Sequence, residues 1–166
     1  MTLLHLAVLA LLLASATNLA LMIPGGFVEM RDFSAYPPLV LGAFNVFLTG
    51  LGLGSFALAY LVARHDTGFG LAAFAGLGYA AVYLLDLGRI FPVAPQAMSR
   101  LLTRLEMLGT GLGFALAMTA AWAWRGGAEQ KTGAALPALP TPILVLLALP
   151  GIGIIAFATR AAMRRK

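Results

Sequence analysis

The chain has 166 residues, of which 61% are hydrophobic and only 10% are charged, and its mean hydropathy is +0.93. A typical soluble domain is about 25% charged, so this composition excludes an ordinary soluble protein and predicts an integral membrane protein. The absence of cysteine excludes disulfides, thiolate metal sites, iron–sulfur ligation and cysteine nucleophiles. The net charge of +5 could suggest nucleic-acid binding, but four of the eleven basic residues lie in the last seven positions. Membrane topology and lipid headgroups explain these charges better, and we expect no nucleic-acid partner.

Five apolar segments are long enough to cross a bilayer. A hydrocarbon core of about 30 Å requires about 20 mostly apolar residues at about 1.5 Å per residue. The segments that meet or nearly meet this requirement are residues 2–23, 38–63, 68–91, 101–124 and 141–160. The chain is therefore predicted to be an all-α, polytopic transmembrane helical bundle that forms a single integral membrane domain over residues 1–166.

The first segment could instead be a secretory signal, because Ala14-Ser15-Ala16 resembles a small-residue cleavage site. It lacks a positively charged start, and its apolar run continues past that site to Ile23. Both features are untypical of signal peptides, so we expect a retained membrane helix.

The distribution of Lys and Arg predicts the orientation of the chain. With five spans, the side that holds the C-terminus receives Arg31, Arg89, Arg100, Arg104, Arg160, Arg164, Arg165 and Lys166. The other side receives Arg64, Arg125 and Lys131. Because positive charge accumulates on the cytoplasmic side, we expect a bacterial inner-membrane protein with its N-terminus outside and its C-terminus in the cytoplasm.

Small residues at a spacing of four mark candidate helix-packing faces. Gly50 and Gly54 form one such pair in the second segment, and Gly109 and Gly113 form another in the fourth. In lipid, glycines of this kind allow two helix backbones to approach closely. We expect both pairs to pack within the chain, and dimerisation or docking of a partner subunit is the alternative.

Polar residues inside the apolar segments are expected to face the bundle interior, because lipid exposure is costly. In the third segment Tyr79, Tyr83 and Asp86 share one stripe at helical spacing, and Glu106 lies on the polar stripe of the fourth. The predicted directions place the charged and amide members toward the cytoplasmic half. These members are Asn18, Asn45, Asp86, Arg89, Arg104 and Glu106. The loop residues Glu29, Arg31 and Asp32 lie on the same side.

Two interpretations of this polar cluster compete. In the structural one, Asp86 and Glu106 are neutralised by Arg89 and Arg104 at the helix ends, where partners and snorkelling reduce the cost of charge. The equal number of acids and bases favours it, and Arg89 is expected opposite Glu106. In the functional one, Tyr79, Tyr83, Asp86 and Glu106 line a vestibule that holds a polar headgroup, a proton or a quinone.

The four residues Asp86-Leu87-Gly88-Arg89 resemble a short sequence of NrfD-type membrane subunits. That resemblance implies a role in quinol oxidation beside iron–sulfur partner subunits. Because those subunits have more spans than this chain can hold, the resemblance supports only the alternative function given below.

No complete reactive constellation is present in the sequence. The glycine runs around residues 50–54 and 109–113 follow no strand and lack the Lys-Ser/Thr ending of a phosphate-binding loop. His5 and His65 have no companion ligands at metal-binding spacing, so we expect interfacial or solvated histidines and no metal. An enzyme is therefore the less favoured interpretation, no catalytic residue is assigned, and the sequence identifies no cofactor.

The favoured function is that of a small accessory or assembly subunit, because packing faces are abundant. Its partners would be the lipid bilayer and other membrane subunits. The alternative is a quinone-, lipid- or small-molecule-binding membrane protein, or a transporter, that uses the inner vestibule. A transporter would use a discontinuous helix, and Pro150-Gly151 is the only candidate break.

Overall fold

The computed structural model describes residues 2–126 and 137–163. Within these ranges the chain forms five helices: α1 (Leu3–Leu21), α2 (Pro38–His65), α3 (Phe69–Leu87), α4 (Arg100–Arg125) and α5 (Thr141–Ala162). Each is long and apolar enough to cross a membrane. The prediction of an all-α transmembrane bundle with five spans is confirmed.

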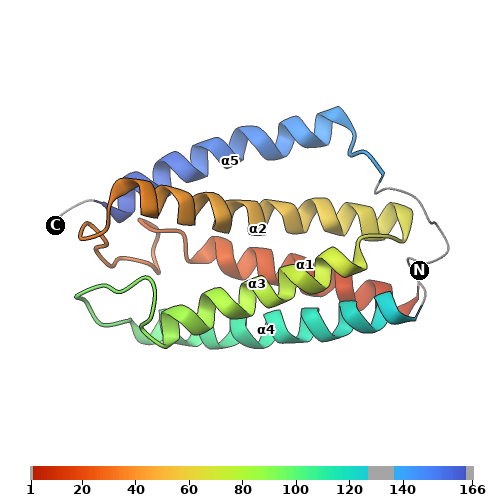
Figure 1. Cartoon of the computed structure of the whole chain (residues 1–166), viewed down its shortest axis with the longest axis horizontal. Coiled ribbons are helices and arrows are strands. Elements are labelled where there is room, and N and C mark those ends of the chain that lie inside the picture. The colour runs from red at the N-terminus through yellow and green to blue at the C-terminus, as the bar shows by residue number, and fades with distance from the viewer. Residues whose placement is uncertain (1, 127–136, 164–166) are drawn as a thin grey trace.

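The helices lie side by side and alternate in direction along the long axis of the molecule (Figure 1). The loop of residues 22–37 and the loop of residues 88–99 therefore meet at the end that also holds the C-terminus, which we call the C-terminal end of the bundle. In the described part of the chain, α1 packs on α2, α3 and α4, whereas α5 packs on α2 alone. The helix α5 is thus peripheral.

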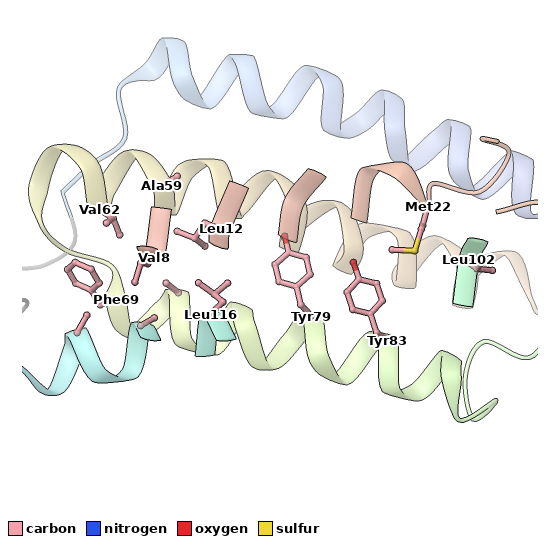
Figure 2. Close-up of a cluster of buried hydrophobic side chains, with 13 residues drawn as sticks. Val8, Leu12, Met22, Ala59, Val62, Phe69, Tyr79, Tyr83, Leu102 and Leu116 are labelled. Atoms are coloured by element: carbon pink, nitrogen blue, oxygen red, sulfur yellow. The ribbon is translucent and has the colours of Figure 1, made fainter. Parts of the chain in front are cut away.

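The apolar core lies between α1, α2, α3 and α4. Val8, Leu12, Phe69 and Leu116 have no exposed surface and occupy the half of the bundle nearer the N-terminus. Toward the C-terminal end this core gives way to Tyr79 and Tyr83, which extend from α3 with their hydroxyls pointing the same way (Figure 2). Polar side chains therefore join the core from the middle of the bundle toward its C-terminal end.

Two glycines bring the backbones of α3 and α4 into direct contact. A Cβ atom on Gly76 would lie 2.5 Å from the Ala117 nitrogen, and one on Gly113 would lie 2.7 Å from the Ala80 nitrogen. Real Cβ atoms do not approach backbone atoms so closely, so only glycine fits at these two positions. A Cβ on Gly109 would likewise lie 2.6 Å from Nδ2 of Asn18 on α1. The pair Gly109 and Gly113 thus packs within the chain.

The other predicted packing pair behaves differently. A Cβ atom on Gly50 or on Gly54 would meet nothing within 4 Å. The expectation that this pair packs within the chain is wrong, because α1 and α5 contact α2 along other faces and leave these glycines on the outer surface.

The third helix ends four residues before the predicted boundary at residue 91. Gly88 caps α3, and Arg89 adopts the left-handed conformation with φ of 54°. The amide of Ile90 then donates to the carbonyl of Leu85 over 2.8 Å, which closes the last turn. The helix is therefore ended by the Gly88-Arg89 turn.

Candidate functional site

A buried guanidinium lies at the C-terminal end of the bundle. Arg31, in the loop between α1 and α2, donates from Nη1 to Oδ1 of Asp86 over 2.9 Å and from Nη2 to Oδ2 of Asp86 over 2.6 Å. It also donates from Nε to Oε1 of Glu29 over 3.0 Å and from Nη2 to Oε2 of Glu29 over 2.5 Å. These bidentate, charge-assisted bonds are the strong class of protein hydrogen bond, and they fasten the loop to α3.

Arg31 stays cationic in this setting. Burial opposes its charged form, but the hydrogen bonds and charges of Asp86 and Glu29 outweigh that effect and raise the pKa of Arg31 above its usual range. Only 7% of its side chain is exposed. The guanidinium is therefore a permanent internal charge that must be balanced by carboxylates.

A third carboxyl group reaches the same place from α4. Glu106 is 2% exposed, and its Oε1 lies 3.9 Å from Nη2 of Arg31. This distance is too long for a hydrogen bond, and the second oxygen, Oε2, has no hydrogen-bond partner among the described residues. We call Glu29, Arg31, Asp86 and Glu106 the acid–arginine cluster. It combines three acids with one base.

The predicted neutralisation of Asp86 and Glu106 by Arg89 and Arg104 is wrong. Both arginines are exposed, and Arg31 supplies the positive charge instead. Arg89 lies beyond the end of α3 in the left-handed turn. Arg104 precedes Glu106 by two residues on α4, and two residues turn a helix by about 200°, so their side chains leave opposite faces. Acids and bases are therefore not matched in number within the cluster.

The tyrosine hydroxyls lie next to the cluster, on the side toward the middle of the bundle. The Asn18 amide nitrogen donates to the Tyr83 hydroxyl over 3.2 Å and to the Leu105 carbonyl over 3.1 Å. One turn earlier on α3, the Tyr79 hydroxyl lies 2.9 Å from Oγ of Ser55 and donates to the Leu51 carbonyl over 3.2 Å. Tyr79 and Tyr83, with Asn18, are thus fixed by hydrogen bonds to three other helices.

Asn45 occupies a different place from the other predicted polar residues. Its amide nitrogen donates to Oγ1 of Thr159 over 3.0 Å and so joins α2 to α5. Asn45 also lines the two cavities described next. It therefore belongs to the edge of the site and not to the acid–arginine cluster.

A cavity opens directly onto the acid–arginine cluster. All four cluster residues line it, together with Tyr83 and apolar side chains such as Leu48 and Phe44. It contains about 580 Å³ of space free of protein atoms, measured out to its mouth. One wall is thus charged and the rest is apolar.

An apolar groove between α1, α2 and α5 adjoins this cavity. The groove contains about 530 Å³ of free space, also measured to its mouth, and it is lined by residues such as Ala16, Gly52 and Ile154. The residues that line both spaces are Leu19, Met22, Pro24, Asn45 and Leu48. A cavity with a charged wall and an apolar groove are therefore adjacent.

The predicted histidines lie at the opposite end of the bundle. Nε2 of His5 lies 3.3 Å from Oδ1 of Asp66, the residue that follows α2. His65 stacks edge-on against Tyr60 with ring centroids 5.8 Å apart. In the part of the chain that the structure describes, no group of three or more His, Asp or Glu side chains could hold a metal ion.

Sequence reasoning missed the two loop members of the cluster. Glu29 and Arg31 were expected on the same side as the other polar residues, in the loop between the first two segments, but they were not assigned as the partners of the buried acids. No periodic pattern could have found them, because the neighbouring apolar residues of the loop differ: Phe33 is buried, whereas Phe27 is fully exposed.

The fold and the buried charge together define the class of protein. Over the described residues it is all-helical, its five helices are long and apolar enough to span a membrane, and an ion-pair cluster is buried at one end. Residues 4–135 match a family model described as Domain of unknown function (DUF8051), and the chain belongs to this family. The matched range holds α1 to α4 and the whole acid–arginine cluster, and it stops before α5. Neither the curated proteins nor the solved structures provide a match.

Proposed function

We propose that this protein binds a small amphipathic molecule from the membrane, with the headgroup at the acid–arginine cluster and the tail in the groove between α1, α2 and α5. The observation that carries the proposal is that a charged cavity adjoins an apolar groove, because five residues line both spaces. Small-molecule sites are typically concave and apolar with a few converging polar groups. A quinone or a lipid has this division into polar head and apolar tail.

The surplus of acid in the cluster supports a binding role over a purely structural one. A helix end that is only pinned would need one acid for one base, whereas here Glu106 remains without a hydrogen-bond partner for Oε2 among the described residues. An unsatisfied buried polar atom is costly, so a group from outside the chain that pairs with it would be bound favourably.

The proposal is tested by a substitution that fills the groove and a measurement of whether the bound amphiphile is then lost. Gly52 lines the groove on α2, and a leucine there would occupy the space of the tail. A Cβ atom on Gly111 of α4 would meet nothing within 4 Å, and this residue is exposed, so Gly111→Leu is the matched control. The two variants and the parent protein are solubilised gently, and co-purified lipids and quinones are identified by mass spectrometry.

We expect the parent protein and Gly111→Leu to retain the same amphiphile at near-stoichiometric amount, and Gly52→Leu to lose most of it. Equal retention by all three proteins would contradict the proposal, because the bound molecule would then lie outside the groove. The absence of any amphiphile from the parent protein would contradict it as well.

A second function, that of an accessory subunit, is favoured by one separate observation. Gly50 and Gly54 face outward on α2 with open space around them, and a GxxxG pair of this kind suits close contact with a helix of another subunit. A stoichiometric complex that survives solubilisation and is lost in Gly54→Leu would support this role. A monomer in mild detergent would argue against it.

For orientation we propose that the C-terminal end of the bundle faces the cytoplasm of a bacterial inner membrane. Arg31, Arg89, Arg100, Arg104 and Arg160 lie at that end by the course of the helices, which supports the positive-inside assignment. The sequence-based prediction of orientation also counted Lys131 and the last three residues, which lie outside the described residues.

The chain has no cysteine, so a single introduced cysteine can be tested for access to an impermeant thiol reagent. Ala35, in the loop between α1 and α2, and His65, at the end of α2, are both exposed and lie at opposite ends of the bundle. We expect the reagent to label His65→Cys in intact cells and Ala35→Cys only after the membrane is opened. Labelling of Ala35→Cys in intact cells would overturn the assignment.

A further inference from the structure

We infer that the headgroup held at the acid–arginine cluster is an uncharged hydroxyl that donates a hydrogen bond to Glu106 and accepts one from Tyr83. This inference rests on the proposed function and narrows the ligand to a chemical class: a membrane alcohol or phenol in place of an anionic lipid. Three observations support it: the unpaired acceptor oxygen of Glu106, the available hydroxyl proton of Tyr83, and the charge of the cavity that both residues line.

The free acceptor is Oε2 of Glu106. Glu106 is 2% exposed, lines the cavity and has no hydrogen-bond partner for this oxygen among the described residues. Arg31 does not satisfy it, because the guanidinium is committed to Glu29 and Asp86 and lies 3.9 Å from the other oxygen of Glu106. Buried polar atoms in proteins are nearly always paired, so this oxygen indicates a donor supplied from the cavity.

The free donor is the hydroxyl of Tyr83, which lines the same cavity. The Leu105 carbonyl can only accept, so the Asn18 group that lies 3.1 Å from it is the amide nitrogen. The same nitrogen lies 3.2 Å from the Tyr83 hydroxyl, which therefore accepts from Asn18. The proton of Tyr83 remains for another acceptor. A headgroup that bridges Tyr83 and Glu106 must accept one bond and donate one, as a hydroxyl does and an ammonium does not.

The charge of the pocket excludes an anionic headgroup. Three carboxyl groups surround one guanidinium, and Arg89 and Arg104 are exposed and do not line the cavity. A phosphate or carboxylate would add negative charge beside these carboxyl groups, and Arg31, the only base among the described residues that line the cavity, is already paired with Glu29 and Asp86. Like charges brought together in a poorly solvated site repel strongly, so such a headgroup would be bound weakly.

The test compares three probes that share one tail. The purified protein in detergent is equilibrated with equal amounts of hexadecanol, hexadecylamine and palmitate, and the bound fraction of each is measured by native mass spectrometry. We expect hexadecanol to be retained about tenfold or more over palmitate, since one hydrogen bond to a charged group corresponds to a factor of at least about ten. Hexadecylamine is expected to be intermediate, because it pairs with Glu106 but leaves Tyr83 without an acceptor.

Two variants locate the selectivity. Glu106→Gln converts one acceptor oxygen into a donor, so the preference for hexadecanol over palmitate should fall about tenfold. Tyr83→Phe should reduce the preference for hexadecanol over hexadecylamine. Arg104→Gln removes one charge from the exposed face of the same helix and should leave both ratios unchanged.

The outcomes separate this inference from the proposed function. If Gly52→Leu abolishes binding of all three probes but palmitate or hexadecylamine binds the parent protein best, the groove holds the tail and the hydroxyl assignment is wrong. If no probe binds the parent protein, the proposed function itself fails. The ratios in the parent protein test the inference even where Glu106→Gln does not fold.

Discussion

Removal of the buried guanidinium tests the acid–arginine cluster most directly. Arg31→Met keeps an unbranched side chain but removes the guanidinium, and it leaves the carboxyl groups of Glu29, Asp86 and Glu106 without a counter-charge. The parent side chain donates both of its bidentate pairs from a position where only 7% of it is exposed. Breaking a buried ion pair by removing one partner typically costs about 3–5 kcal/mol, which is a large fraction of the stability of a typical protein.

We therefore expect Arg31→Met to lower the free energy of unfolding by about 3–5 kcal/mol, measured by reversible unfolding in mixed micelles with increasing dodecyl sulfate. Arg31→Lys keeps the charge but loses the bidentate geometry and should be intermediate. Arg89→Met removes an exposed arginine at the same end of the bundle and should change stability by about 0.5 kcal/mol or less. Adding Asp86→Asn to Arg31→Met should recover part of the loss, because one unpaired carboxylate is then removed.

The reasoning would be refuted by equal stability of Arg31→Met and Arg89→Met. That result would mean that the carboxyl groups of the cluster are reached by water or by protons at no cost once Arg31 is gone. A loss in Arg31→Met that Asp86→Asn deepens would refute the charge argument while leaving the burial of the cluster intact.

Four further substitutions test the packing. Gly113→Ala places a Cβ 2.7 Å from a backbone nitrogen of α3 and should destabilise the protein by about 1–3 kcal/mol in the same unfolding assay. A Cβ on Gly54 meets nothing within 4 Å, so Gly54→Ala should be neutral or slightly stabilising. Equal effects of the two substitutions would contradict the assigned helix faces. Tyr79→Phe removes hydroxyl contacts of 2.9 and 3.2 Å and should cost about 0.6 kcal/mol, with about 1.7 as an upper bound. Asn45→Ala removes the 3.0 Å hydrogen bond from α2 to α5, so spin labels on cysteines introduced into the two helices should show a broader distance distribution; an unchanged distribution would mean that apolar contacts alone hold α5.

The spans were predictable because they depend on composition over many residues. All five helices begin within one or two residues of the predicted positions. The inward orientation of Tyr79, Tyr83, Asp86 and Glu106 was predictable as well, since helical periodicity and the cost of polar groups in lipid act in the same direction, and the structure buries all four.

The partners of the buried acids were not predictable in the same way. Helical spacing says nothing of the conformation of residues 22–37, where Arg31 and Glu29 lie, and a loop of this length can direct either side chain inward or outward. The early end of α3 also depends on a left-handed residue that is not glycine, Arg89, which is uncommon. The error at Arg104 was avoidable, because its offset of two residues from Glu106 already places the two side chains on opposite faces.

The acid–arginine cluster joins three parts of the chain that enter the membrane at different times. Arg31 lies between α1 and α2, but its partners Asp86 and Glu106 belong to α3 and α4. During synthesis the loop of residues 22–37 is made first, and Glu29 is the only cluster partner of Arg31 until α3 supplies Asp86. Glu106 follows with α4. The loop can therefore close onto the bundle only after α3 is in place, and the cluster is complete only when the first four helices have assembled.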